Sequence, residues 1–164
     1  MDEQLKEAPA KTSPKDIFLH LFAIVTLYAS AISFLTLVFQ LINVAFPDPL
    51  DTYGYAVESA KGTLRFAAAS LIVVFPVHIW AMWLLNKGYA ATPYKRNLRI
   101  RKWLIYFTLF VAGIIIMGNL VTLLYRLLDG DLTMRFALKI LTVFLVAGSV
   151  FWYYYWDLKK YNVE

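Results

Sequence analysis

Two histidines are the residues of this chain that most directly suggest chemistry, because imidazole can bind a haem iron or carry a proton. His20 and His78 each lie in a long apolar run. At a rise of 1.5 Å per residue, they lie about 4 to 5 Å and about 12 Å from the same membrane surface. One haem iron cannot be reached from both depths, so bis-histidine ligation is not expected. His78 follows Pro76 by two residues, and we interpret it as satisfying polar groups beside a proline kink; a proton relay is the alternative.

Other reactive groups are missing from the sequence. The chain contains no cysteine, which excludes disulfides, thiolate metal sites and a cysteine nucleophile. Its long apolar runs contain no aspartate or glutamate, which removes the usual carboxylate of proton-coupled transporters and the acid–base pair of intramembrane hydrolases. We therefore expect no enzymatic activity and no bound cofactor.

Polar and basic residues are expected to gather at the outer membrane surface, where they could line a vestibule for an anion. Lys139 lies about 9 Å inward of Thr133 and shares a helix face with Arg135. An ammonium at that depth is costly unless it is paired, hydrated or able to snorkel to the surface, and snorkelling is the alternative explanation. Asp129 and Asp131 could instead neutralise the positive charge of this basic region. The candidate vestibule or polar pathway consists of Gln40, Asn43, Arg65, Thr122, Arg126, Arg135 and Lys139.

A stripe of small and polar residues recurs every three or four positions along the first apolar run, and its counterparts in the third run are mostly small or polar. Membrane helices associate through such residues, so we interpret the stripe as a packing seam; a polar pathway is the alternative. The candidate seam consists of Ser30, Ser33, Thr36, Ala112 and Gly118.

Four apolar runs, 17–46, 64–85, 103–128 and 134–156, take up most of the chain. Each exceeds the roughly 20 helical residues that cross a bilayer. Hydrophobic residues make up 60% of the chain and charged residues 16%, against roughly 45–50% and 25% in soluble domains. The sequence therefore predicts an all-α polytopic membrane protein. Its four transmembrane helices would form one domain, 17–158, between tails 1–16 and 159–164.

The two halves of the chain resemble each other. Thr63-Leu-Arg-Phe-Ala aligns with Thr133-Met-Arg-Phe-Ala, and Thr26-Leu27 aligns with Thr108-Leu109. A duplicated helical hairpin would enter the membrane twice from the same side. We therefore expect two tandem hairpins related by a pseudo-twofold axis along the membrane normal.

The middle loop, 86–102, carries six Lys and Arg and no acidic residue. By the positive-inside rule, both termini of this predicted inner-membrane protein are cytoplasmic. The basic face of this loop would lie against anionic lipid headgroups, and we expect no nucleic-acid binding because that face is not free to track phosphates. The candidate lipid contacts are Lys95, Arg96, Arg99 and Lys102.

Helix starts are marked by proline after a capping residue. Ser13-Pro14 predicts the start of the first helix, and Asp48-Pro49 predicts a short helix on the outer surface that continues to about Gly62. Thr92-Pro93 indicates that the third helix begins before Trp103.

Several segments resemble a group of bacterial four-span membrane proteins catalogued only as a domain of unknown function: Thr63-Leu-Arg-Phe-Ala, Phe75-Pro76, Arg101-Lys-Trp-Leu-Ile-Tyr and 130–139. The resemblance covers roughly 17–158 and implies a bacterial membrane protein, without an activity, ligand or site. The residues favour a non-catalytic module that forms a homo-oligomer or binds a membrane protein partner. The alternative is an oligomeric channel or transporter for a small ion or solute.

Overall fold

The computed structural model describes residues 12–47, 54–130 and 132–160. These ranges contain four long helices, α1 (Pro14–Ala45), α2 (Tyr55–Ala91), α3 (Arg99–Asp129) and α4 (Met134–Lys160), with a short 3₁₀ helix, η1 (Pro93–Asn97), between α2 and α3. The described ranges contain no strand. All four long helices have the length and apolarity needed to cross a membrane. The predicted all-α, four-span architecture is therefore confirmed.

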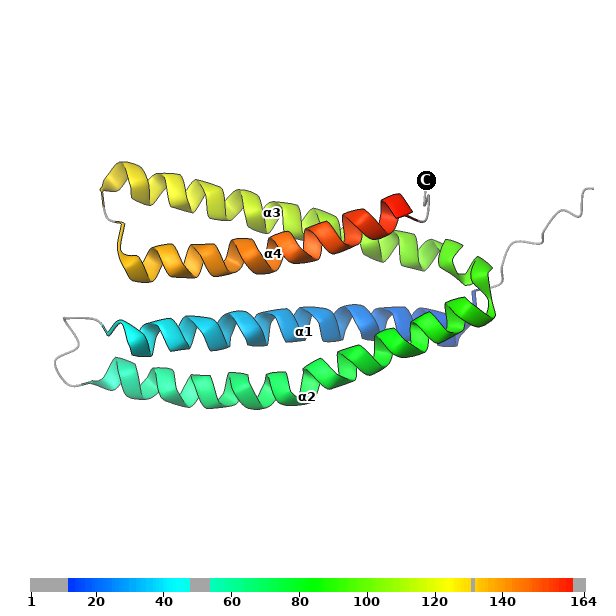
Figure 1. Ribbon diagram of the computed structural model, residues 1–164, viewed down its shortest axis with the longest axis horizontal. Coiled ribbons are helices and arrows are strands. Elements are labelled where there is room, and N and C mark those ends of the chain that lie inside the picture. The colour runs from blue at the N-terminus through cyan, green and yellow to red at the C-terminus, as the bar shows by residue number, and fades with distance from the viewer. Residues whose placement is uncertain (1–11, 48–53, 131, 161–164) are drawn as a thin grey trace, which may run out of the picture.

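The helices form two antiparallel hairpins, α1–α2 and α3–α4, which lie side by side (Figure 1). α1 packs against α4 and, over a shorter length, against α3. Within the described residues, the backbone of α2 contacts only α1 and η1. The backbone packing between the hairpins is thus asymmetric, because the backbone of α1 lies close to that of α4, whereas the backbones of α2 and α3 are not in contact within the described residues. The pseudo-twofold axis stays a prediction from the sequence.

The two ends of the bundle differ in character. We call one the basic end (residues 12–20, 82–105 and 153–160); there α1 begins, α2 and α4 end, and η1 leads into α3. We call the other the turn end (residues 40–47, 54–65, 122–130 and 132–139); there α1 and α3 end and α2 and α4 begin. The basic end carries nine Lys and Arg but only two acidic residues. It is therefore the strongly cationic end of the molecule.

Helix boundaries agree with most of the predicted start signals. The Ser13 side chain accepts a hydrogen bond from the Asp16 N–H at 3.3 Å and caps α1, with Pro14 in its first turn. Thr92 and Pro93 begin η1 rather than α3, because buried Leu98 has an extended backbone that separates the two helices. α3 still begins before Trp103, at Arg99, as expected.

The predicted helix on the outer surface is not a separate element in the described residues. Its proposed start, 48–51, lies outside them, and the segment from Tyr55 to Gly62 is the beginning of a continuous α2. A consequence is that Thr63 lies inside a helix, where its hydroxyl donates to the Ser59 carbonyl at 3.2 Å. Its counterpart Thr133 instead precedes α4 and accepts from the Phe136 N–H at 3.3 Å. The two copies of the motif therefore begin their helices differently.

Small side chains dominate the fully buried positions of α2, where Ala60, Ala67 and Ala81 are 5%, 2% and 0% exposed. Small residues let membrane helices approach closely, which explains the long α1–α2 contact.

Figure 1 shows that α2 bends near its middle, and Pro76 lies in this region. Large apolar residues cover the outside of all four helices, as expected for helices surrounded by hydrocarbon.

Candidate functional site

Two basic residues of the candidate vestibule join the hairpins at the turn end. Arg135 of α4 donates from Nε to the Phe46 carbonyl at 2.9 Å, and its Nη2 donates to the same oxygen. Lys139, also on α4, places its ammonium 5.7 Å from the centroid of the Phe39 ring of α1. A backbone carbonyl at a helix end and an aromatic face are both favourable partners for a cation. These two cations therefore stabilise the α1–α4 contact.

The polar neighbours of these cations bind each other or pack within their own hairpin. Asn43 donates to the Gln40 side chain at 2.8 Å along α1. The Arg126 guanidinium of α3 lies 5.5 Å from the centroid of the Phe136 ring of α4. Gln40 and Asn43 therefore bind each other within α1, and Arg126 packs within the α3–α4 hairpin.

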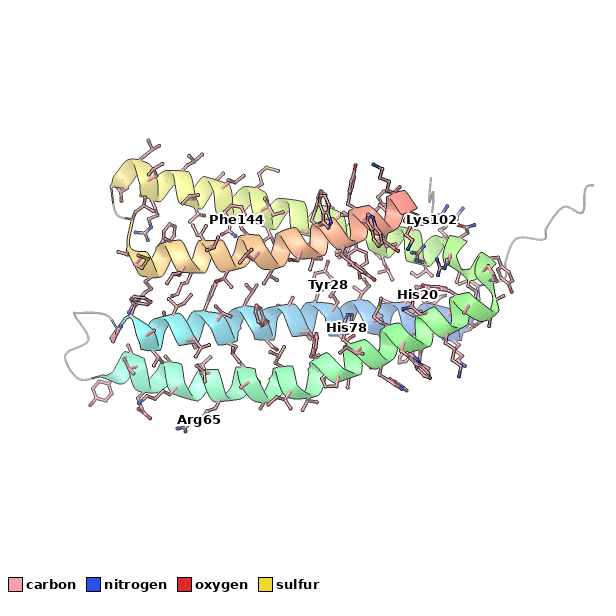
Figure 2. The ribbon with its side chains drawn as sticks, viewed as in Figure 1. His20, Tyr28, Arg65, His78, Lys102 and Phe144 are labelled. Carbon is pink, nitrogen blue, oxygen red and sulfur yellow. The ribbon has the colours of Figure 1, made fainter. Side chains whose placement is uncertain are left out.

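The remaining vestibule candidates lie elsewhere. Figure 2 shows Arg65 pointing away from the bundle, from the outer side of α2. Thr122 is exposed on α3, and its hydroxyl donates to the Gly118 carbonyl of its own helix at 2.8 Å. The seven candidates therefore do not surround a common space within one chain. Their part in a pathway between several chains stays a prediction.

The candidate seam is divided between the inside and the outside of the bundle. Ser30 of α1 and Ala112 of α3 are buried, and Ser33 and Thr36 are half-buried on α1. Gly118 is exposed, and a Cβ added to it would meet no neighbouring atom within 4 Å. Within one chain, the seam thus packs at its α1 residues and at Ala112 but is open at Gly118.

The cations proposed to contact lipid all belong to the basic end: Lys95, Arg96, Arg99 and Lys102. Two of them also hold the bundle together. Lys95 of η1 forms an ion pair with Asp16 of α1 at 2.9 Å, and the Arg96 guanidinium lies 5.5 Å from the centroid of the Tyr89 ring. Arg99 is exposed, and Lys102, labelled in Figure 2, lies on the first turn of α3. Their contact with lipid stays a prediction.

A buried ion pair at the basic end joins α3 to α4. Arg101 is only 7% exposed, and its Nη2 donates to the Asp157 carboxylate at 2.5 Å. Its Nη1 donates to the Arg96 carbonyl at 2.9 Å, which fixes η1 to the start of α3. The same guanidinium lies 5.5 Å from the centroid of the Tyr89 ring of α2. Arg101 thus contacts η1, α2 and α4 at once.

His20 connects this ion pair to α1. Its Nδ1 lies 2.6 Å from the Asp16 carbonyl oxygen, and its Nε2 lies 2.7 Å from the Tyr89 hydroxyl. Because a carbonyl oxygen can only accept, Nδ1 of the neutral ring donates to Asp16 and Nε2 accepts the Tyr89 proton. Both ring nitrogens are therefore engaged. We call these residues the basic-end network: Asp16, His20, Tyr89, Arg96, Arg101 and Asp157.

Four members of the network line a cavity of about 60 Å³, whose wall also includes Asn86 and Tyr154; they are His20, Tyr89, Arg101 and Asp157. A cavity needs roughly 10–15 Å³ of such space for one water molecule, so this one can hold several. Its walls combine a cation, a carboxylate, an imidazole and three phenols. The arrangement can bind water or a small polar group while it holds four helices together.

His78 has a structural environment of a different kind. Its Nδ1 lies 3.1 Å from the Ala23 carbonyl oxygen and 3.1 Å from the Thr26 hydroxyl, both on α1. The interpretation of His78 as a satisfied side chain near the Pro76 kink fits this geometry, with partners on α1.

Within the described residues, no three His, Cys, Asp or Glu side chains are grouped closely enough to hold a metal ion.

Replacing Tyr89 with phenylalanine is expected to lower the free energy of unfolding by about 1 kcal/mol. The variant keeps the ring between the two guanidinium groups but removes the hydroxyl that donates to His20. Thermal unfolding in detergent should show a melting temperature about 2–4 °C lower. Tyr94→Phe is the control, because Tyr94 is 53% exposed. Equal shifts in the two variants would contradict this role for the Tyr89 hydroxyl.

Comparison with known protein families gives a match over most of the chain. Residues 16–154 match the family model described as Domain of unknown function (DUF5671). The match covers nearly the whole region that resembles four-span proteins in sequence. No curated protein and no solved structure matches the chain.

Proposed function

This chain belongs to the DUF5671 family, and we propose that it is a non-catalytic membrane module that self-associates through the outer face of α3. The module spans the inner membrane with its basic end and both termini in the cytoplasm. The excess of Lys and Arg at the basic end supports this orientation, because cationic segments are retained on the cytoplasmic side.

The observation that carries the proposal is the exposed surface around Gly118. No neighbouring atom lies within 4 Å of the position that a Cβ would occupy, so a second helix could approach the α3 backbone closely. Thr122 lies one turn away, and its hydroxyl is already satisfied by the Gly118 carbonyl. A partner helix would therefore meet a glycine flanked by the exposed apolar side chains of Ile114 and Val121, and a Thr122 hydroxyl that already has a partner.

The contacts of the ionisable groups support a non-catalytic role. Both ring nitrogens of His20 are hydrogen-bonded, and the charges of Arg101 and Asp157 neutralise each other. These groups line the cavity of the basic end, but their contacts with one another hold helices together. The alternative is an oligomeric channel or transporter. It requires the vestibule residues of several chains to meet around a common space, because within one chain they do not.

Disulfide cross-linking of single-cysteine variants tests self-association. The chain has no native cysteine, so Gly118→Cys provides one thiol on the proposed interface. Ile72→Cys is a matched control, because Ile72 is 73% exposed on α2 and lies as far from the basic end as Gly118 does. We expect several-fold more cross-linked dimer from Gly118→Cys after oxidation in membranes.

Equal cross-linking of the two variants would contradict the proposed interface. Ser33→Cys is a less direct probe, because Ser33 is half-buried inside its own chain. Dilution of the protein with excess lipid separates specific association from random collision. The yield from Gly118→Cys should persist on dilution, whereas that from Ile72→Cys should fall.

A further inference from the structure

We propose that the groove between α2 and α4 binds an anionic phospholipid. One acyl chain lies in the groove, and the phosphate lies at its polar end, near Asn86 and Lys87. The proposed binding site is distinct from the Gly118 face and goes beyond self-association, so either proposal can fail without the other.

The groove exists because α2 and α4 do not pack against each other. The backbone of α2 contacts only α1 and η1 within the described residues, and a space of about 550 Å³ remains between α2 and α4. Apolar side chains from three helices form most of its wall, among them Leu27, Ile79, Trp83 and Val150. Its volume falls within the roughly 300–1,000 Å³ of typical ligand sites. The groove is open along one side and lies on apolar helices, so a lipid chain can enter it from the bilayer.

The groove lies beside the polar cavity of the basic-end network. Four residues line both spaces: Met82, Asn86, Tyr153 and Tyr154. The cavity beyond them is lined by His20, Arg101 and Asp157. An apolar space beside a small polar one suits an amphiphile, whose acyl chain would lie in the groove and whose head would lie toward the polar end.

The charge at this end selects an anionic head. The Lys87 ammonium lies 5.1 Å from the centroid of the Trp83 ring, which itself lines the groove. Arg101 at the adjoining cavity is paired with Asp157, so Lys87 is the cation that faces the phosphate most directly. The basic end as a whole carries nine Lys and Arg against two acidic residues. A basic residue near the membrane surface attracts anionic lipid. A phosphate diester at the groove mouth therefore meets cations, whereas a zwitterionic choline head adds a positive charge that these cations repel.

Photo-crosslinking with lipid analogues tests the site in the full-length protein. The protein is reconstituted in phosphatidylcholine vesicles that contain a trace of phosphatidylglycerol or phosphatidylcholine with a diazirine on one acyl chain. After illumination, we expect phosphatidylglycerol to label the groove segments 79–86 and 149–154 about fivefold more than phosphatidylcholine does. Equal labelling of these segments by the two probes would overturn the proposal.

Two variants test the binding of the acyl chain and the binding of the phosphate head separately. Ser149→Trp fills the groove, because Ser149 lines it, and should reduce labelling of segment 79–86 several-fold with both probes. Val73→Trp is the control, since Val73 is 64% exposed on α2 and is not among the residues that line the groove, and should leave that labelling unchanged. Lys87→Gln should remove most of the preference for phosphatidylglycerol without altering the fold, because Lys87 is exposed. An unchanged preference in Lys87→Gln, or unchanged labelling in Ser149→Trp, would overturn the proposal.

Discussion

Replacing Arg101 with alanine is expected to lower the free energy of unfolding by about 3 kcal/mol or more, since it leaves the Asp157 carboxylate without its charge partner in a largely buried site. The same change removes the Arg101 contacts with the Arg96 carbonyl and the Tyr89 ring. In a chain of this size, the melting temperature should fall by roughly 6–12 °C. Thermal unfolding of the purified protein in detergent measures this change.

Two further variants show whether the loss comes from a broken buried pair. Lys61→Ala breaks the exposed Lys61–Glu58 pair, whose side chains are 47% and 71% exposed, and should cost less than about 0.5 kcal/mol. The double variant Arg101→Met/Asp157→Leu removes both charges and should regain most of the stability lost in Arg101→Ala. Similar losses in Arg101→Ala and Lys61→Ala would contradict the proposed role of the basic-end network.

Replacing Ala67 with leucine is expected to lower the free energy of unfolding by about 2 kcal/mol. Ala67 is 2% exposed, and α2 has only α1 beside it along this part of its length. The added methyl groups must push α1 and α2 apart, because membrane helices this close leave no space for a branched side chain. The measurement is again the melting temperature in detergent.

The sequence supplies an unusually close control for this change. Ala137 occupies the position equivalent to Ala67 in the repeated Thr-x-Arg-Phe-Ala motif, but it is exposed on α4. Ala137→Leu should therefore leave the melting temperature nearly unchanged. An equal fall in melting temperature for Ala67→Leu and Ala137→Leu would contradict the different packing of these two positions.

The four helices could be predicted from the sequence because apolar length alone specifies a membrane span. The predicted runs fall within the observed helices apart from a single residue at the end of the first run. The start signal at Asp48-Pro49 predicted a helix that continues to about Gly62, but as an element separate from the second span. Its continuity with that span was missed, because Glu58, Lys61 and Gly62 interrupt the apolar pattern at the start of α2.

The basic-end network was missed because its members are far apart in the chain. Arg101 and Asp157 are separated by 56 positions, and His20 and Tyr89 by 69. Which of the basic residues in the loop turns inward depends on how α3 is rotated against its neighbours. One signal was present: Arg101 has the helical spacing of Thr108 and Ala112, and all three are buried on α3. A prediction from hydropathy alone counts Arg101 only as one of the positive charges of the middle loop.

Helical geometry also explains why the predicted seam divides at Gly118. With 3.6 residues per turn, the six positions from Ala112 to Gly118 rotate the side chain by about 240° around the helix. Gly118 therefore faces away from the buried side of α3 that carries Ala112. Aligning the third apolar run with the stripe of the first could not reveal this rotation. An alignment compares residue types, but it does not show which face of α3 is buried.

Cysteine accessibility in intact bacterial cells tests most directly whether this bundle spans the membrane. Tyr55 is exposed at the turn end and Lys159 at the basic end, and the native chain has no cysteine. A membrane-impermeant maleimide should label Tyr55→Cys in intact cells but label Lys159→Cys only after the membrane is opened. Equal labelling of both variants in intact cells would place the two ends on one side and contradict a membrane-spanning bundle.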